Sequence, residues 1–185
     1  MKILILNGSP HKKGTSALLI SEFKRGAEEN GHEVTIFDTA SETIHPCIAC
    51  DHCRTSSSGC VFQDGMETLN PMLMDADLVV FSTPLYYFGM SAQIKAVIDR
   101  FYANNQKLRD HQKKAILLAT CGDTDPWAMD ALKHHYETVC HYLGWEDCGS
   151  LLGIGMYTRD DIENSTYPEK AYAFGKSICD MRQEH

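Results

Sequence analysis

The chain has 185 residues, of which 43% are hydrophobic and 23% are charged, and its formal net charge is −8 at pH 7. This length and composition suit one globular domain spanning residues 1–185. Because binding to nucleic acid requires many Lys and Arg side chains, the negative charge argues against a nucleic acid partner. No apolar stretch approaches the roughly 20 residues that span a bilayer. As no secretory leader pattern is present either, we expect a cytoplasmic protein without a membrane partner.

Apolar runs and helical patterns alternate in the first half of the chain. The predicted elements are, in order, a strand at residues 2–6, a helix from residue 15 or 16 to about 30, a strand at 32–38, a cysteine-rich loop at about 45–63 and a helix at about 65–75. Thr15 or Ser16 is the candidate cap of the first helix, and Gly31 is typical of a helix end. Asp64 followed by Glu67 resembles a capping box for the second helix.

The same alternation continues in the second half. The predicted elements are a strand at residues 77–83, a helix from 91 through 101, a strand at 114–120, a helix through 132–143, a strand at 148–154 and a final helix from about 166. Ser91 is the candidate cap of the first of these helices, and Gly144 is expected to end the second. Thr166 and Glu169 resemble a capping box for the last helix.

Five strands that alternate with five helices predict an α/β fold. Such an order calls for right-handed crossovers and for a parallel sheet with helices on both faces, which is a three-layer doubly wound sandwich. Ligands of these sheets bind beyond the carboxyl ends of the strands, where the strand order reverses. The loops after Leu6, Thr83 and Thr120 are therefore the candidate binding site.

The loop after the first strand has the features of a phosphate-binding loop. It joins a buried strand to a helix N-terminus, where free N–H groups and the helix dipole favour an anion. Ser9, Thr15 and Ser16 add hydroxyl groups, and His11 and two Lys residues add positive charge. The glycine spacing fits neither an NTPase P-loop nor the dinucleotide fingerprint, and no Cys is present to act as a phosphatase nucleophile. The alternative is a strand-to-helix turn that binds nothing.

Two further loops complete the candidate site. The loop after the third strand consists of Pro84, Leu85, Tyr86, Tyr87, Phe88 and Gly89. Aromatic rings next to flexible backbone suit a flat heteroaromatic ligand, and core packing or a subunit contact is the alternative. The loop after the fourth strand consists of Thr120, Cys121, Gly122 and Asp123. Alternative roles are a buried small residue for Cys121 and a helix cap for Asp123.

Four cysteines form the pattern C-x2-C-x2-C-x6-C in the loop at about 45–63. They are Cys47, Cys50, Cys53 and Cys60. Four thiolates at this spacing suit an iron-sulfur cluster, and a four-cysteine zinc site or free thiols would satisfy the same residues. A disulfide framework is the less favoured use in a chain without an export signal. Cys140, Cys148 and Cys179 lie in predicted helices or strands and are interpreted as packing residues.

The first loop, with Gly8-Ser9-Pro10 and Gly14-Thr15-Ser16, resembles the FMN-phosphate loop of NADPH-dependent FMN reductases, a flavodoxin-like family. The common family form has Asn before the Thr, where this chain has Gly14. The loop at 84–89 is similar to the segment that binds the isoalloxazine ring, and the loop at 120–123 to the one that closes over it. The resemblance implies strand order 2-1-3-4-5, FMN as cofactor and NAD(P)H as co-substrate. The FMN-binding residues that it implies are Ser9, Pro10, His11, Thr15, Ser16, Pro84, Leu85, Tyr86, Tyr87, Phe88, Gly89, Thr120, Cys121, Gly122 and Asp123.

The cysteine pattern resembles that of the iron-sulfur flavoproteins within the flavodoxin-like proteins. In that group the flavin exchanges electrons with a 4Fe-4S cluster near a subunit interface. The resemblance therefore implies a 4Fe-4S cluster on the four cysteines and a homodimer or higher homo-oligomer.

The implied activity is that of an FMN-dependent oxidoreductase. NAD(P)H would deliver a hydride to FMN, and the reduced flavin would pass electrons to a small-molecule acceptor, through the cluster where one is bound. The chemistry belongs to the flavin, so no catalytic side chain is expected. One alternative is an electron carrier that exchanges electrons with ferredoxin-like partners and does not use NAD(P)H. The other is a metal or redox sensor whose flavin site is vestigial.

Overall fold

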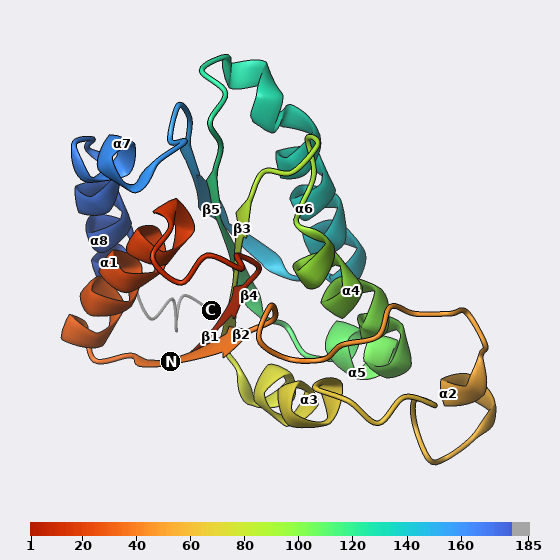
Figure 1. Ribbon diagram of the computed structural model, residues 1–185. Helices are drawn as coiled ribbons and strands as arrows, with labels where there is room; N and C mark the ends of the chain where they lie inside the picture. Colours follow the sequence, from red (N-terminus) through yellow and green to blue (C-terminus); the bar gives the residue numbers. More distant parts are fainter. Residues whose placement is uncertain (179–185) are drawn as a thin grey trace.

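The computed structural model describes residues 1–178, and a five-stranded parallel sheet forms its centre (Figure 1). The strands are β1 (Lys2–Asn7), β2 (Glu33–Asp38), β3 (Leu78–Pro84), β4 (Lys114–Thr120) and β5 (Glu146–Gly153). Their order in the sheet is β2-β1-β3-β4-β5, and every neighbouring pair is parallel. The predicted fold class and strand order are therefore confirmed.

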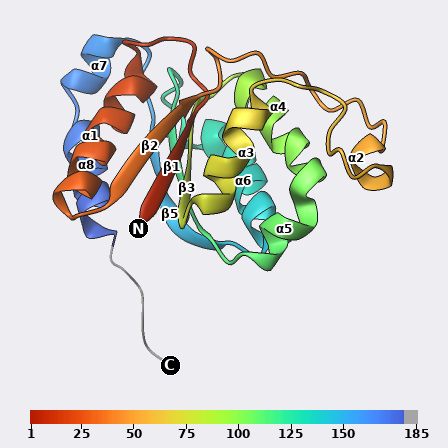
Figure 2. The same cartoon turned by 90° about the horizontal axis from the view of Figure 1, so that it is seen from below.

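Helices cover both faces of the sheet (Figures 1 and 2). One face carries α1 (Thr15–Glu29), α7 (Arg159–Glu163) and α8 (Tyr167–Ser177), and the other carries α3 (Met66–Asp75), α4 (Ala92–Arg100), α5 (Asn105–Asp110) and α6 (Asp130–Leu143). The remaining helical segments are α2 (His52–Thr55) and two 3-10 turns, η1 (Phe101–Asn104) and η2 (Pro126–Met129). The sequence did not predict α2, α5 or α7, since each has too few residues for a helical period to repeat. No helix within residues 1–178 is long and apolar enough to cross a membrane.

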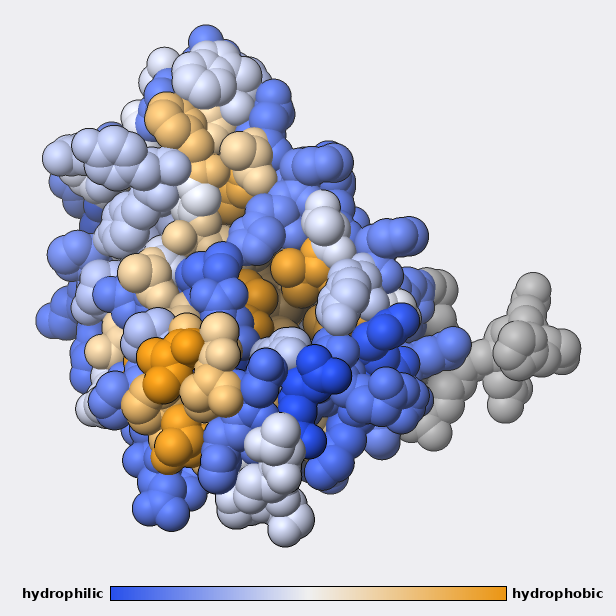
Figure 3. Space-filling view, turned by 90° about the vertical axis from the view of Figure 1, so that its right-hand side faces the viewer, coloured by the Kyte–Doolittle hydropathy of each residue, from blue (hydrophilic) through white to orange (hydrophobic). Residues whose placement is uncertain are grey.

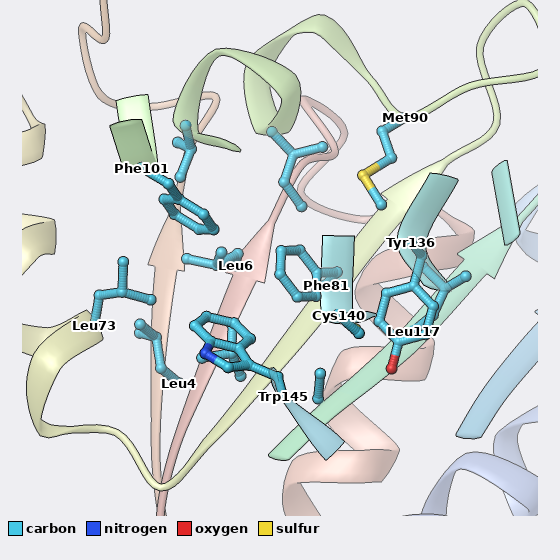
Figure 4. Packing of buried hydrophobic residues seen from close by; sticks show 14 of the residues in the cluster. Leu4, Leu6, Leu73, Phe81, Met90, Phe101, Leu117, Tyr136, Cys140 and Trp145 are labelled. Atoms are coloured by element: carbon cyan, nitrogen blue, oxygen red, sulfur yellow. The ribbon is translucent and has the colours of Figure 1, made fainter. Parts of the chain in front are cut away.

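The sheet separates two hydrophobic clusters. The larger cluster lies between the sheet and the helices α3, α4 and α6, and its centre is Phe81 of β3, which contacts Tyr136 and Trp145 with ring centroids 5.9 and 6.4 Å away (Figure 4). The buried Trp145 ring donates its Nε1–H to the carbonyl of Leu108 at 3.0 Å, which satisfies its one polar atom. The second cluster lies between the sheet and the helices α1 and α8.

Helices α1 and α8 approach each other at two glycines. A Cβ atom at Gly26 would overlap the backbone carbonyl of Tyr172, and one at Gly175 would overlap that of Phe23. Only glycine allows the two backbones to lie this close, so both positions fix the packing of α8 against α1.

Helix ends agree with the sequence at some positions and correct it at others. Ser91 caps α4 and Gly144 ends α6 in the left-handed conformation, as predicted. Thr15 and Ser16, however, lie within the first turn of α1, and Gly14 is its N-cap.

Two of the predicted capping boxes need correction as well. The box predicted at Thr166 and Glu169 is wrong, because Thr166 makes no side-chain cap hydrogen bond and the box is instead formed by Thr158 and Asp161 at the start of α7. At α3, the Asp64 carboxylate accepts from the Met66 N–H at 3.1 Å, but the N-cap is Gly65.

Candidate functional site

The loops after β1, β3 and β4 are joined by hydrogen bonds at the carboxyl edge of the sheet. The Thr120 hydroxyl lies 2.9 Å from the Thr15 hydroxyl and 3.1 Å from that of Ser16, which links the ends of β4 and β1. The Thr120 carbonyl accepts from the Leu85 N–H at 2.8 Å, which adds the loop after β3. The Ser91 hydroxyl donates to the Gly8 carbonyl at 2.7 Å and ties the start of α4 to the same place. The sequence-predicted loops therefore form one connected edge.

The first loop leaves the start of α1 open. Within the loop, the Ser9 N–H donates to the Asn7 side chain, the His11 N–H to the Ser9 hydroxyl and the Gly14 N–H to the His11 carbonyl. The Gly8 N–H donates to the Ser82 carbonyl of β3. The N-terminal N–H groups of α1 have no side-chain cap, and no acidic residue lies in its first turn. The hydroxyls of Thr15 and Ser16 are bonded to Thr120, and neither of them caps these groups. An uncapped helix start of this kind fits a phosphate group.

Glycine is required at the base of this loop. A Cβ at Gly8 would lie 2.7 Å from the Ser91 hydroxyl oxygen and 3.2 Å from the Ser82 carbonyl oxygen. The chain therefore turns from β1 into the loop through a space that holds no side chain. Pro10 and His11 lie beyond this point on the exposed part of the loop.

Arg159 of α7 also reaches the first loop, a contact that the sequence did not predict. Its guanidinium donates to the Gly14 carbonyl at 3.4 Å and pairs with Glu163 on its own helix. The capping box of Thr158 and Asp161 was the signal that could have located this helix. Arg159 places a cation beside the start of α1, where an anion would also benefit from it.

The loop after β3 forms a tight hairpin that presents aromatic rings. Tyr86 and Gly89 exchange two backbone hydrogen bonds of 3.1 Å, and the two residues between them, Tyr87 and Phe88, have positive φ angles of 46° and 62°. Such turns favour Asn and Gly, so two aromatic residues here carry backbone strain of about 1–3 kcal/mol each. Strain of this kind clusters at binding sites.

The exposed rings of this hairpin have a neighbour that the sequence analysis did not select. The Phe88 ring stacks on Trp127 of η2, with centroids 5.1 Å apart and planes inclined by 20°. Tyr87 is fully exposed, and Phe88 and Trp127 are about half exposed. Pro126 at the start of η2, followed by a large aromatic residue in a loop, was the available signal.

The loop after β4 is fastened to the loop after β5. The Cys121 carbonyl accepts from Met156 N–H, and the Asp123 carbonyl accepts from Gly155 N–H, both at 2.6 Å. Gly122 faces the exposed Tyr157 ring, and a Cβ there would lie 2.7 Å from its Cδ2. Burial raises the pKa of the Cys121 thiol, so this side chain is a neutral packing group at pH 7 rather than a nucleophile.

The four predicted cysteine ligands line one pocket in the segment between β2 and α3. This segment, which includes α2, projects beyond α4 and α5 (Figures 1 and 2). Cys47 and Cys50 are exposed and Cys53 and Cys60 are half-buried. Within residues 1–178, however, no three His, Cys, Asp or Glu side chains are arranged as a metal site. The donor set fits a thiolate-bound metal or cluster, but the four sulfurs do not converge on one point.

The surface of the cysteine segment is unusually apolar. Ile48 and Val61, which line the same pocket, are exposed. Figure 3 shows an apolar patch on the side of the molecule that carries this segment. Ala49 and Asp51 have positive φ angles of 53° and 55°, so the backbone between the first three cysteines is strained as well.

A buried ion pair attaches the cysteine segment to α4. Arg100 donates to the Asp64 carboxylate at 2.8 and 3.3 Å and to the His45 carbonyl at 2.9 Å. Burial alone would raise the pKa of Asp64, but hydrogen bonds from Arg100, His45 and Met66 outweigh it and lower the pKa to about 2. On the same helix, Lys95 and Asp99 form an exposed ion pair of 2.6 Å.

The other cysteines lie apart from this pocket. Cys140 is buried in the larger cluster, as predicted, and Cys148 is half-buried on β5. Cys179 lies outside the described residues.

Comparison with known proteins adds a family to this geometry. Residues 1–156 match the family model described as NADPH-dependent FMN reductase. An iron-sulfur flavoprotein of Methanosarcina thermophila is 33% identical over 182 residues, which cover 98% of this chain and 95% of that protein. One from Methanocaldococcus jannaschii is 30% identical over 168 residues, which cover 86% and 83%. An iron-sulfur flavoprotein of Archaeoglobus fulgidus is 42% identical over 98 residues, which cover 53% of this chain and 49% of that protein.

A solved structure supports the fold. The NAD(P)H:quinone oxidoreductase from Methanothermobacter marburgensis superimposes with a TM-score of 0.76 over 100% of this chain and 99% of that chain. Its sequence identity is 19%, so this likeness concerns the architecture alone.

Proposed function

Since the chain belongs to the family of NADPH-dependent FMN reductases, we propose that it binds FMN at the carboxyl edge of the sheet and reduces a small-molecule acceptor with electrons from NAD(P)H. Bound FMN would supply the hydride and electron chemistry, and the protein would bind, orient and shield it. The observation that carries this proposal is the uncapped start of α1, held by Thr120 against the other two loops.

The first loop is proposed to hold the FMN phosphate. The free N–H groups at the start of α1 would donate to it, together with the Ser9 hydroxyl. One of the Thr15 and Ser16 hydroxyls would donate as well, namely the one that accepts from the single Thr120 proton. Arg159 would add positive charge beside the group, in a protein whose net charge is −8, and His11 would add a ring on the exposed part of the same loop. Pro10 would shape the loop without donating a hydrogen bond.

The other two loops are proposed to place the flavin ring. The hairpin at 84–89 would contribute backbone groups and the rings of Tyr86, Tyr87 and Phe88, and the loop at 120–123 would cover the opposite edge. The stack of Phe88 on Trp127 borders the same edge of the sheet, and its exposed aromatic surface suits a planar acceptor. A quinone, which is small and planar, is therefore the first acceptor to test.

The cysteine segment is proposed to bind a 4Fe-4S cluster through Cys47, Cys50, Cys53 and Cys60. The donor set and the similarity to two iron-sulfur flavoproteins over most of the chain support this proposal. Binding would require the strained loop to close around the cluster. The exposed apolar side chains of Ile48 and Val61 beside the cysteines favour a homodimer or higher homo-oligomer that covers them.

The test is an absorption spectrum of protein purified without oxygen, combined with iron and acid-labile sulfide assays, before and after addition of NADPH. Flavin bands that bleach with NADPH would support the reductase, and stoichiometric iron with a broad visible shoulder would support the cluster. Flavin bands without iron would leave an FMN reductase with free thiols or zinc. Failure to bind FMN after reconstitution would overturn the proposal.

A second candidate is an electron carrier that exchanges electrons with a ferredoxin-like partner. The projecting and exposed cysteine segment favours it, because a partner protein could approach this segment without reaching the flavin edge. Rapid mixing separates the two functions. A carrier would be reduced by ferredoxin but not by NADPH or NADH, whereas the reductase would be reduced by a nicotinamide nucleotide directly.

A further inference from the structure

Arg100 forms part of the wall of the cysteine pocket. It lies at the last position of α4, lines the same pocket as the four cysteines, and is 3% exposed. A cation buried this far is stable only where hydrogen bonds replace its water. Its hydrogen-bond partners therefore show which groups hold the side chain in place and which of its donors has no partner.

The two terminal nitrogens of the guanidinium are occupied. They bind the Asp64 carboxylate and the His45 carbonyl at 2.8–3.3 Å, and the guanidinium carbon lies 5.3 Å from the centre of the Phe62 ring. The Nε–H is also buried, and it has no hydrogen-bond partner among the described residues. An unsatisfied buried donor is unfavourable and calls for an explanation.

The other polar groups of the pocket wall have partners. Asp51 accepts from the Tyr102 hydroxyl at 3.0 Å, and Asp99 pairs with Lys95 at 2.6 Å. The four cysteine sulfurs line the same pocket as Arg100, and as thiolates they would add charged acceptors beside it.

We propose that Arg100 is a positioning residue of the cysteine pocket, whose Nε–H donates to a cysteine sulfur when the four thiolates bind a metal or cluster. Four thiolates bring more negative charge than a divalent cation cancels, and hydrogen bonds to ligand sulfur stabilise that charge. Asp64 fixes the guanidinium plane, so the Nε–H is oriented before the metal arrives. This inference rests on the proposed use of the four cysteines as ligands.

The experiment uses Co²⁺ as the probe, added without oxygen to the reduced full-length protein. Thiolate-bound Co²⁺ has an intense charge-transfer band whose energy depends on the hydrogen bonds that the sulfurs accept. Arg100→Lys keeps the positive charge but removes the Nε–H. It should bind Co²⁺ about tenfold more weakly, as expected for loss of one hydrogen bond to a charged group, and the band should move to lower energy.

Arg54→Lys is the matched control. Arg54 belongs to the same segment and donates to Tyr102, but it does not line the four-cysteine pocket. Its replacement should change neither the Co²⁺ affinity nor the band. An Arg100 that merely holds the segment in place would alter affinity without moving the band, and that result would overturn the proposal. The proposal would also be overturned if Arg100→Lys kept the wild-type Co²⁺ affinity and band energy, or if the wild-type protein showed no thiolate band.

A measurement on the wild type covers the case in which Arg100→Lys does not fold. In protein with ¹⁵N-labelled arginine, the Arg100 Nε–H proton resonance should move downfield when Zn²⁺ binds, and a resonance that does not move would contradict the proposal. FMN binding and bleaching by NADPH are measured on the same samples. They test the proposed reductase independently, because Arg100 does not belong to the three flavin loops.

Discussion

The flavin edge and the cysteine segment are held in place by different means. At the flavin edge, three loops extend from neighbouring strands and Thr120 joins them through short hydrogen bonds. The cysteine segment projects from the molecule, and its buried polar attachment is the Arg100–Asp64 pair with the backbone of His45. The sheet itself therefore positions the first site, whereas the second is positioned by one buried ion pair and by exposed hydrogen bonds of Asp51 and Arg54 with Tyr102.

The largest effect is expected from breaking that ion pair. Asp64→Asn leaves Arg100 buried without its counter-charge and should lower the free energy of unfolding by about 3–5 kcal/mol. If the two regions are independently held, the cysteine segment should become open to trypsin at Arg54 while FMN affinity stays at the wild-type level. Cleavage is followed by mass spectrometry and FMN binding by flavin fluorescence.

Asp51→Asn is the control for this experiment, because its partner Tyr102 of η1 is exposed, so that loss of their hydrogen bond should cost little stability. Loss of FMN binding in step with cleavage would show that the two regions are one cooperative unit.

The reverse experiment perturbs the flavin edge alone. A methyl group in Gly8→Ala would meet the Ser91 hydroxyl and the Ser82 carbonyl, which should cost about 1–3 kcal/mol of stability. FMN should bind about 100-fold more weakly, since the loop must shift by a few tenths of an ångström from the phosphate position. Trypsin sensitivity at Arg54 should not change. Gly89→Ala is the control for the stability effect, because its Cβ would have no neighbour nearer than 3.9 Å.

Acid should act on the cysteine segment through Asp64. Its folded pKa of about 2 lies below the ordinary value of 3.8, so the carboxylate contributes stability above about pH 4 that is lost as the pH falls through 2. The contribution is about 2 kcal/mol. Urea unfolding should therefore show a difference between wild type and Asp64→Asn that shrinks between pH 4 and pH 2. A constant difference over this range would contradict the assigned pKa.

The smallest effect is expected in the strained hairpin. Tyr87 is fully exposed and has a positive φ angle, so Tyr87→Gly should relieve strain and raise stability by up to about 1 kcal/mol. Thermal unfolding monitors the change. A destabilised variant would mean that contacts of the Tyr87 ring stabilise the fold by more than the backbone strain costs.

The sequence was sufficient to predict the sheet and its loops, because periodicity and chain order carry that information. Continuous apolar runs located β1, β3 and β4, and the alternation with helices fixed their connections. The carboxyl edge then followed from topology. Thr15 and Ser16 were correctly placed at that edge but given the wrong local role, since a hydroxyl that could cap a helix is bonded instead to Thr120, 104 or 105 residues away.

The features that sequence reasoning missed depend on contacts between distant residues. The position of Trp127 against Phe88 and of Arg159 against Gly14 comes from packing of the loops after β4 and β5. The ion pair of Arg100 and Asp64 joins residues 36 positions apart, and no local sequence pattern predicts it. The four-cysteine spacing was visible in the sequence, but the wall that faces those cysteines was not.

The central claim is that the uncapped start of α1 anchors the phosphate of FMN. It is tested most directly by fluorescence titration of the apoprotein with FMN and with riboflavin, which lacks the phosphate. We expect FMN to bind at least about 100-fold more tightly, because riboflavin leaves these N–H groups without their charged acceptor. Equal affinity for the two flavins would contradict it.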